Sequence, residues 1–202
     1  MKKLILSSGN AHKVQEIRSI LEEFDLEVVS KNEMGLSNFE VEEDGDTLEY
    51  NALKKARELS KLVEGIVIAD DTGLFVDALK GAPGVYSARY AGEDCDYKAN
   101  NKKLIEELKG VQEAERTARF RTVMAVIFED GEEAIIEGVC EGKILTEAVG
   151  EAGFGYDPLF QPIGYDSTFA ELGAEIKNKI SHRAKALVNM KEYLKTHLEQ
   201  IK

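Results

Sequence analysis

The chain opens with the segment that decides the fold, Leu4-Ile5-Leu6-Ser7-Ser8-Gly9-Asn10-Ala11-His12-Lys13. Its first three residues are apolar, as in a buried strand, and an amphipathic pattern follows the turn. The apolar face of that pattern carries Val14, Ile17, Leu21 and Phe24. A strand that turns through glycine and asparagine into a helix directs unpaired backbone N–H groups at the space above the turn, which makes it a ready anion site.

Lys13 supports an anion at this turn. A cation in the first turn of a helix opposes the helix dipole unless a negative charge compensates it, so its position indicates phosphate. Ser8 and Asn10 also fit a simpler role as helix caps. Taken alone, the segment favours the capping interpretation, and the rest of the chain has to decide.

The remaining pattern predicts strands alternating with helices. Strands are expected at 4–6, 26–29 and 66–69, helices at 47–63 and 97–108, and a hairpin with strands 117–128 and 133–145. Residues 70–73 are expected to terminate the third strand, and a short helix near 170–172 and a long one from Ser181 are expected at the end. Such units around a long hairpin predict an α/β fold with a mixed sheet.

Composition and charge exclude several classes of protein. The 202 residues carry a formal net charge of −12, so long-range electrostatics repel nucleic acids and anionic membranes. No apolar stretch has the length of a membrane span, and the first apolar run is too short for a signal peptide. Cys95 and Cys140 have no metal-ligand spacing. We therefore expect reduced thiols in a cytoplasmic protein.

Two groups of carboxylates suggest a metal site. Asp70 and Asp71 follow the strand 66–69, and ligands of α/β sheets bind at the carboxyl ends of strands. Because neighbouring strand residues point to opposite sides, at most one of the two aspartates enters a shared site. A second cluster comprises Glu40, Glu42, Glu43 and Asp44. Carboxylates from two loops near phosphates suit Mg²⁺, whereas the alternatives are a turn-capping aspartate and a solvated acidic loop.

Lys55 lies on the expected inner face of the helix 47–63, with Leu48, Ala52 and Leu59. An amine on that face is costly unless it has an anionic partner, although most helix lysines only solubilise the surface. This position gives weak support to a nearby anion.

Two later motifs combine aromatic, acidic and basic residues. Phe154-Gly155-Tyr156-Asp157-Pro158 joins an aromatic ring, a flexible glycine and a carboxylate, which together suit contact with a nucleobase. A loop that packs its own aromatics is an equally good interpretation. Ser181-His182-Arg183 places cations at a helix start, where an anion would relieve the conflict with the dipole, and Lys177 adds charge.

Five motifs together resemble the inosine triphosphate pyrophosphatase family, also called non-canonical purine NTP pyrophosphatases or Ham1-like proteins. They are residues 8–13, 69–74, 81–89, 154–158 and 181–183, in the order of the family. The resemblance implies a Mg²⁺-dependent enzyme that converts XTP, ITP or dITP into the monophosphate and pyrophosphate. It also implies one domain over residues 1–202, usually a homodimer, with a two-lobed α/β fold, a long mixed sheet with flanking helices, and an active-site cleft between the lobes.

The resemblance assigns roles residue by residue. Asp71 would accept the proton of the attacking water and, with Glu43, bind Mg²⁺; Glu42 is the alternative to Glu43. Lys55 would neutralise the triphosphate and Thr72 would contact a phosphate. The triphosphate would be held by Ser8, Gly9, Asn10, Ala11, His12 and Lys13. The nucleoside and base would be bound by Phe154, Gly155, Tyr156, Asp157, Lys177, His182 and Arg183.

Two other functions remain open at this point. A Maf-like pyrophosphatase acting on modified pyrimidine nucleotides would have a similar fold, but the motifs 154–157 and 181–183 argue against it. A nucleotide-binding regulator without turnover would not need a base beside the metal, so the acids Glu43 and Asp71 argue against that function.

Overall fold

The computed structural model describes residues 2–9, 14–15, 17–18, 21–22, 24–92 and 96–200, with side chains described as far as His197. Within these ranges seven strands form a mixed sheet in the order β2-β1-β3-β5-β6-β7, and β4 pairs with β3. β1 runs parallel to β2 and β3, whereas β4 and β7 are antiparallel to their neighbours. The predicted α/β class and mixed sheet with flanking helices are confirmed.

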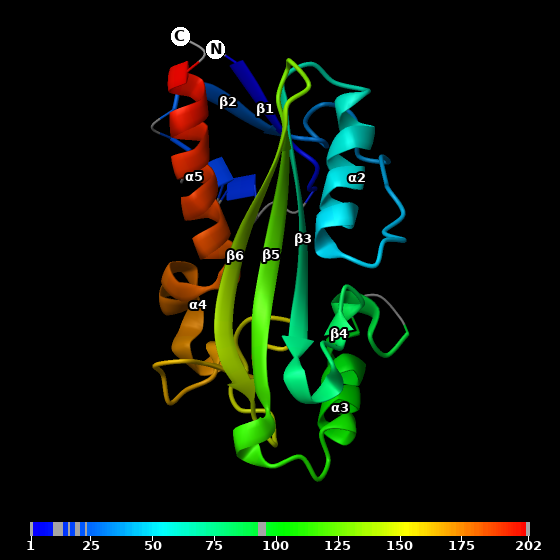
Figure 1. The fold of residues 1–202 in the computed structure, drawn as a ribbon, viewed down its shortest axis with the longest axis vertical. Helices are drawn as coiled ribbons and strands as arrows, with labels where there is room; N and C mark the ends of the chain where they lie inside the picture. Colours follow the sequence, from blue (N-terminus) through cyan, green and yellow to red (C-terminus); the bar gives the residue numbers. More distant parts are fainter. Residues whose placement is uncertain are drawn as a thin grey trace. The chain divides into compact units, whose positions relative to one another are not determined.

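The strands and helices have the following bounds. The strands are β1 Lys2–Leu6, β2 Leu26–Ser30, β3 Ile66–Val76, β4 Pro83–Gly84, β5 Thr117–Ile127, β6 Glu133–Ile144 and β7 Phe160–Pro162. The helices are α2 Leu48–Ser60, α3 Tyr97–Glu107, α4 Phe169–Ile180 and α5 His182–Gln200. β5 and β6 form the predicted hairpin and lie side by side in Figure 1. In the described part of the chain, no helix combines the length and apolar character that a membrane span requires.

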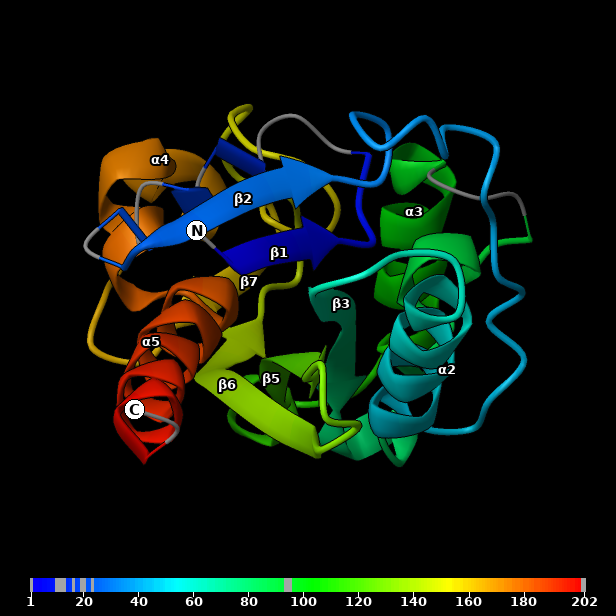
Figure 2. The ribbon, with the colours of Figure 1, turned by 90° about the horizontal axis from the view of Figure 1, so that it is seen from above.

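The chain divides into two compact units. The first comprises residues 1–71, 123–137 and 186–202, and the second comprises residues 72–122 and 138–185. In the first, β1 and β2 lie side by side and point the same way (Figure 2). Its core joins Leu4 and Leu6 of β1 to Ile66 and Ile68 of β3, and the predicted apolar residues Val14, Ile17 and Leu21 are buried against them.

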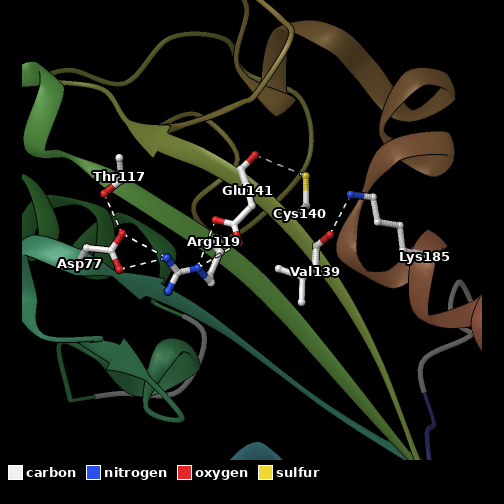
Figure 3. A network of polar contacts seen from close by, with 7 residues as sticks. All are labelled: Asp77, Thr117, Arg119, Val139, Cys140, Glu141 and Lys185. Atoms are coloured by element: carbon white, nitrogen blue, oxygen red, sulfur yellow. Dashed lines mark hydrogen bonds and ion pairs between the residues drawn. The ribbon is translucent and has the colours of Figure 1, made fainter.

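The second unit has its own apolar core, which includes Phe120, Phe160 and Phe169. Outside this core a polar network links neighbouring strands (Figure 3): Arg119 of β5 bonds to Asp77 and to Glu141 of β6. Cys140 is a buried free thiol, and its burial raises the pKa of the thiol. This fits the expectation of a reduced thiol at that position, whereas Cys95 lies outside the described residues.

The predicted end of the third strand at residues 70–73 is wrong, because β3 continues to Val76. The sequence Asp-Asp-Thr-Gly is typical of a turn, but here these residues form part of a strand and contact neighbouring strands. The Thr72 and Thr122 hydroxyls lie 2.8 Å apart, and β5 is the neighbour of β3 in the sheet. Gly73 serves close packing, since a Cβ there would lie 2.4 Å from the Gly84 carbonyl oxygen of β4.

The short helix expected at 170–172 is also longer than predicted. α4 runs from Phe169 to Ile180 and is interrupted at Gly173, where φ is 73°. Thr168 begins it with a capping box: its hydroxyl accepts from Glu171 N, and the Glu171 carboxylate accepts from Thr168 N. The continuation beyond Gly173 carries Lys177, so the interruption does not end the helix before this predicted site residue.

Candidate active site

Lys55 lies on the buried face of α2. The Thr47 hydroxyl caps the start of the helix by accepting from Tyr50 N at 3.1 Å. The buried face then follows helical spacing through Leu48, Ala52 and Leu59, as predicted. Only 16% of the Lys55 side chain is exposed.

The Lys55 ammonium contacts acidic and carbonyl oxygens from two segments of the first unit. Its Nζ donates to the Glu43 carboxylate and, at 2.6 Å, to the Asp70 carbonyl oxygen. The Asp71 Oδ1 lies 3.9 Å from the same nitrogen. Burial by itself lowers the pKa of Lys55, but the negative charges of Asp71, Asp70 and Glu43 outweigh it and raise the pKa above its ordinary value. The side chain therefore stays cationic.

The sheet explains why Asp71 lies in this site although β3 does not end there. The last pair between β1 and β3 is Leu6 with Ile68, and Ser7 N extends it by donating to the Ile68 carbonyl at 2.8 Å. Asp71 lies three residues beyond Ile68, where β1 has already ended. It is 9% exposed. Asp71 therefore lies just beyond the carboxyl end of β1, although it is in the middle of β3. The carboxyl ends of strands are where α/β sheets bind ligands.

The donor set of this site fits Mg²⁺. Glu43 and Asp71 both present carboxylate oxygens to one ammonium, so a cation is already stabilised between the two segments. The part of the chain that the structure describes has no group of three or more His, Cys, Asp or Glu that could hold a metal. Mg²⁺ does not need one, because it binds through one or two carboxylates and completes its shell with water and substrate phosphates.

Two glutamates of the acidic loop are alternatives for the metal ligand, and their surroundings in the structure differ. Glu43 contacts Lys55, whereas Glu42 is exposed. We therefore retain Glu43 as the proposed metal ligand. Asp44, the next residue, forms an exposed pair with Lys54 at 2.6 Å, a kind of contact that contributes little to stability.

The quoted opening segment is described only in part. Ser8 and Gly9 follow β1 in the first unit, whereas Asn10, Ala11, His12 and Lys13 lie outside the described residues. The anion turn therefore stays a prediction. Thr72, the other predicted phosphate contact, hydrogen-bonds Thr122 through its hydroxyl.

In the second unit, the predicted base-binding loop is organised by Asp157 and Lys177. The Asp157 carboxylate is buried; its Oδ2 accepts from Phe154 N at 3.0 Å and from Lys177 Nζ at 2.5 Å. The same ammonium lies 4.5 Å from the centroid of the Phe154 ring. Phe154 as a whole residue is 53% exposed. Asp157 thus holds the loop, and Phe154 is the member that offers a free surface to a planar ligand.

Further contacts hold this loop in ways that the sequence did not indicate. Asn101 of α3 donates to the Gly155 carbonyl at 3.0 Å, and the Tyr156 hydroxyl donates to the Ser87 carbonyl at 2.8 Å. Tyr97 lies beside the exposed Phe154 ring, with 6.2 Å between ring centroids. An asparagine on a helix carries no sequence signal for such a contact, so Asn101 could not have been identified from the chain alone.

The motif 181–183 forms the predicted helix start. The Ser181 hydroxyl accepts from Ala184 N at 3.2 Å. The His182 ring is buried and stacks on Phe120, with 4.7 Å between centroids and 17° between planes. The Arg183 Nε is buried and has no acceptor among the described residues. Of the three, Arg183 is the side chain best suited to donate to a ligand.

Replacing Asp157 with asparagine is expected to destabilise the protein by about 3–5 kcal/mol, because it breaks a buried ion pair and leaves the Lys177 charge uncompensated. The asparagine oxygen can still accept from Phe154 N, so the loop backbone is retained. Urea unfolding followed by circular dichroism measures the change. The matched control is Asp166→Asn, also in the second unit but outside this loop; equal stability losses would show that the buried pair has no special role.

The Ham1 family model matches residues 4–193 of this chain. A protein of Caldanaerobacter subterraneus subsp. tengcongensis, named dITP/XTP pyrophosphatase, is 52% identical over 201 residues, covering 99% of this chain and 100% of its own length. A Bacillus subtilis protein of the same name is 49% identical, covering 96% and 98%. The solved structure of the Staphylococcus aureus Ham1 protein matches with a TM-score of 0.90 and 38% identity, covering 97% and 100%. On this full-length similarity, the chain belongs to the Ham1 family.

Proposed function

We propose that this chain hydrolyses non-canonical purine nucleoside triphosphates, such as XTP, ITP and dITP, to the monophosphate and pyrophosphate. The observation that carries the proposal is the half-buried Lys55 ammonium, which faces the Glu43 and Asp71 carboxylates. Two full-length relatives bear the name dITP/XTP pyrophosphatase and support the same activity.

The reaction needs positioning and charge neutralisation more than covalent chemistry. Mg²⁺, when bound by Glu43 and Asp71, supplies positive charge to the phosphates and favours deprotonation of a water. The Asp71 carboxylate accepts the proton of the water that attacks the α-phosphorus. Lys55, which stays cationic beside these acids, neutralises charge on the phosphates. Thr72 and the segment 8–13 are assigned to phosphate contacts by the resemblance to the family.

The base selectivity is assigned to residues of the second unit. The exposed Phe154 ring offers a stacking surface for a planar base. The buried Arg183 Nε is a donor without an acceptor among the described residues, and the 6-carbonyl of hypoxanthine or xanthine is an acceptor. Adenine carries a donor at that position, so the Arg183 donor rejects it by leaving two polar groups unpaired.

The Maf-like alternative is not favoured, because the model that matches residues 4–193 is that of the Ham1 family. The Mg²⁺ dependence, the homodimer, the cytoplasmic location, the single domain over 1–202 and the cleft between lobes stay predictions. They rest on the resemblance and on the cysteine pattern.

A panel of nucleotides tests the substrate class. ITP, dITP, XTP, ATP, GTP, UTP and dUTP are compared at equal concentration with Mg²⁺, with kcat/KM measured for each. We expect the hypoxanthine and xanthine nucleotides to exceed ATP and the pyrimidine nucleotides by at least about 10²-fold, because unpaired buried polar groups can discriminate by up to about 10⁴–10⁵-fold. A preference for a pyrimidine nucleotide would contradict the proposal.

A further inference from the structure

Among the described residues of α2, the buried side chains are Leu48, Asn51, Ala52, Ala56 and Leu59, and of these only Asn51 is polar. It is completely buried, one helical turn before Lys55 and on the same side of the helix. Its Oδ1 accepts from Gly45 N at 2.9 Å. Gly45 lies two residues after Glu43, so the amide contacts the loop that carries the proposed metal ligand.

The amide is not explained by packing. Its Nδ2 is buried and has no acceptor within the described ranges, a situation that costs stability because the donor has lost its hydrogen bonds to water. An apolar side chain of similar size, such as leucine, would avoid that cost. What only the amide oxygen provides is an acceptor for the buried Gly45 N–H.

The loop approaches Asn51 closely. A Cβ on Gly45 would lie 2.2 Å from the Tyr50 ring and 2.7 Å from the Asn51 Oδ1. Three contacts in succession join this loop to the helix, and Figure 1 shows the two segments beside each other: Asp44 with Lys54, Glu43 with Lys55, and Gly45 with Asn51. Of these, only the contact between Gly45 and Asn51 is both buried and uncharged.

The three contacts differ in charge, and this difference determines which of them can hold the loop on the helix when a cation and a triphosphate are bound. Lys55 holds Glu43 with the same ammonium that is assigned to the phosphates, so a bound cation and triphosphate compete with that pair. The pair between Asp44 and Lys54 is exposed and contributes little. The hydrogen bond from Gly45 N to Asn51 involves no charged group, so neither a cation nor a phosphate competes for it directly.

We infer that Asn51 is a positioning residue that fixes the acidic loop on α2 and thereby holds the Glu43 carboxylate in place to bind the metal. The inference rests on the proposed function, because it concerns the role of Glu43. Partners that orient metal ligands typically contribute 10–100-fold to metal affinity. Asn51 acts through the loop backbone and touches neither metal nor substrate.

The test compares Asn51→Leu, which removes the acceptor at similar volume, with Asn51→Asp, which restores an oxygen at the same place. Binding of Mn²⁺ to the full chain without nucleotide is followed by electron paramagnetic resonance. We expect Asn51→Leu to raise the Kd for Mn²⁺ about 10–100-fold and Asn51→Asp to stay within about threefold of the wild type. With ITP, Asn51→Leu should raise the Mg²⁺ concentration for half-maximal rate more than the KM for nucleotide.

Asn100→Leu is the matched control. Asn100 is also a buried helix asparagine: it accepts from Ala91 N at 2.7 Å and donates to the Ala88 carbonyl at 2.9 Å, but it belongs to the second unit. It should lose stability and keep the wild-type Kd for Mn²⁺. If Asn51→Leu does not fold, Gly45→Ala displaces the loop from the other side of the contact and should raise the Kd in the same way.

Two results would overturn the inference: an Asn51→Leu Kd within threefold of the wild type, or equal losses in Asn51→Leu and Asn100→Leu. Failure of the proposed function has a different signature. A wild type that binds Mn²⁺ but releases no pyrophosphate from ITP refutes the proposed function, while the comparison of Mn²⁺ affinities still decides the role of Asn51.

Discussion

Asp71→Asn is expected to lower kcat for ITP hydrolysis about 10³-fold, within the range that a general base contributes, while the protein stays folded. The substitution keeps the size of the side chain but removes the proton acceptor and one of the two proposed metal ligands. Asp71 lies in the middle of β3 and is 9% exposed, so its oxygens are held by a rigid element. Steady-state kinetics at saturating Mg²⁺, with circular dichroism as a check on folding, measure the effect.

Asp77→Asn is the matched control for this prediction. Asp77 directly follows the same strand, is exposed, and pairs with Arg119, which also belongs to the second unit. Its substitution should leave kcat within about twofold, because exposed ion pairs contribute little. A kcat for Asp71→Asn near that of the wild type would refute the assignment of the base.

Lys55→Met is expected to lower kcat/KM about 10²–10³-fold, the size of effect seen when one group that stabilises developing charge is removed. Methionine fills a similar volume on the apolar face of α2, but it brings no charge to the phosphates or to the facing carboxylates. Lys54→Met, at the adjacent and more exposed position, is the matched control and should stay close to the wild-type value. Equal losses in the two variants would show that net charge, rather than the position of Lys55, matters.

The pKa of Lys55 determines how the stability difference between the wild type and Lys55→Met depends on pH. Its folded pKa is raised above the ordinary value of 10.5, so the stabilisation that its charge supplies is complete below 10.5 and is lost as the pH rises through the higher folded value. The difference in unfolding free energy between wild type and Lys55→Met should therefore be constant from about pH 6 to 9. Denaturant unfolding across that range measures it, and a change centred near neutral pH would contradict the assignment.

The sequence predicted the parts of the fold that have strong periodicity. The helix from Thr47, the helix from Tyr97 and the hairpin around Gly131 were all placed within a few residues, because each has a clear apolar pattern and a cap or turn. The end of β3 was predicted too early in the chain, because Asp-Asp-Thr-Gly favours a turn locally. Pairing with β4 and the neighbouring β5 overrides that preference, and no local pattern encodes such pairing.

The site was predicted in its residue types more than in its contacts. The position of Lys55 on an apolar helix face indicated an anionic partner, and the structure supplies Glu43 as that partner. The pairing of Lys177 with Asp157 and the support from Asn101 were missed, because they join segments that are 20 and 54 residues apart in the chain. Asn51 did carry a signal: it is an amide on a helix face whose other fully buried residues are leucines and alanines.

The products of dITP hydrolysis test the central claim most directly. Wild-type protein is incubated with dITP and Mg²⁺, and nucleotide products, pyrophosphate and orthophosphate are quantified together. The proposed mechanism predicts one pyrophosphate for each dIMP formed, with no dIDP and no orthophosphate, and no products from Asp71→Asn on the same timescale. Orthophosphate with dIDP, or intact dITP after incubation with the wild type, would contradict the assignment of this site to attack at the α-phosphorus.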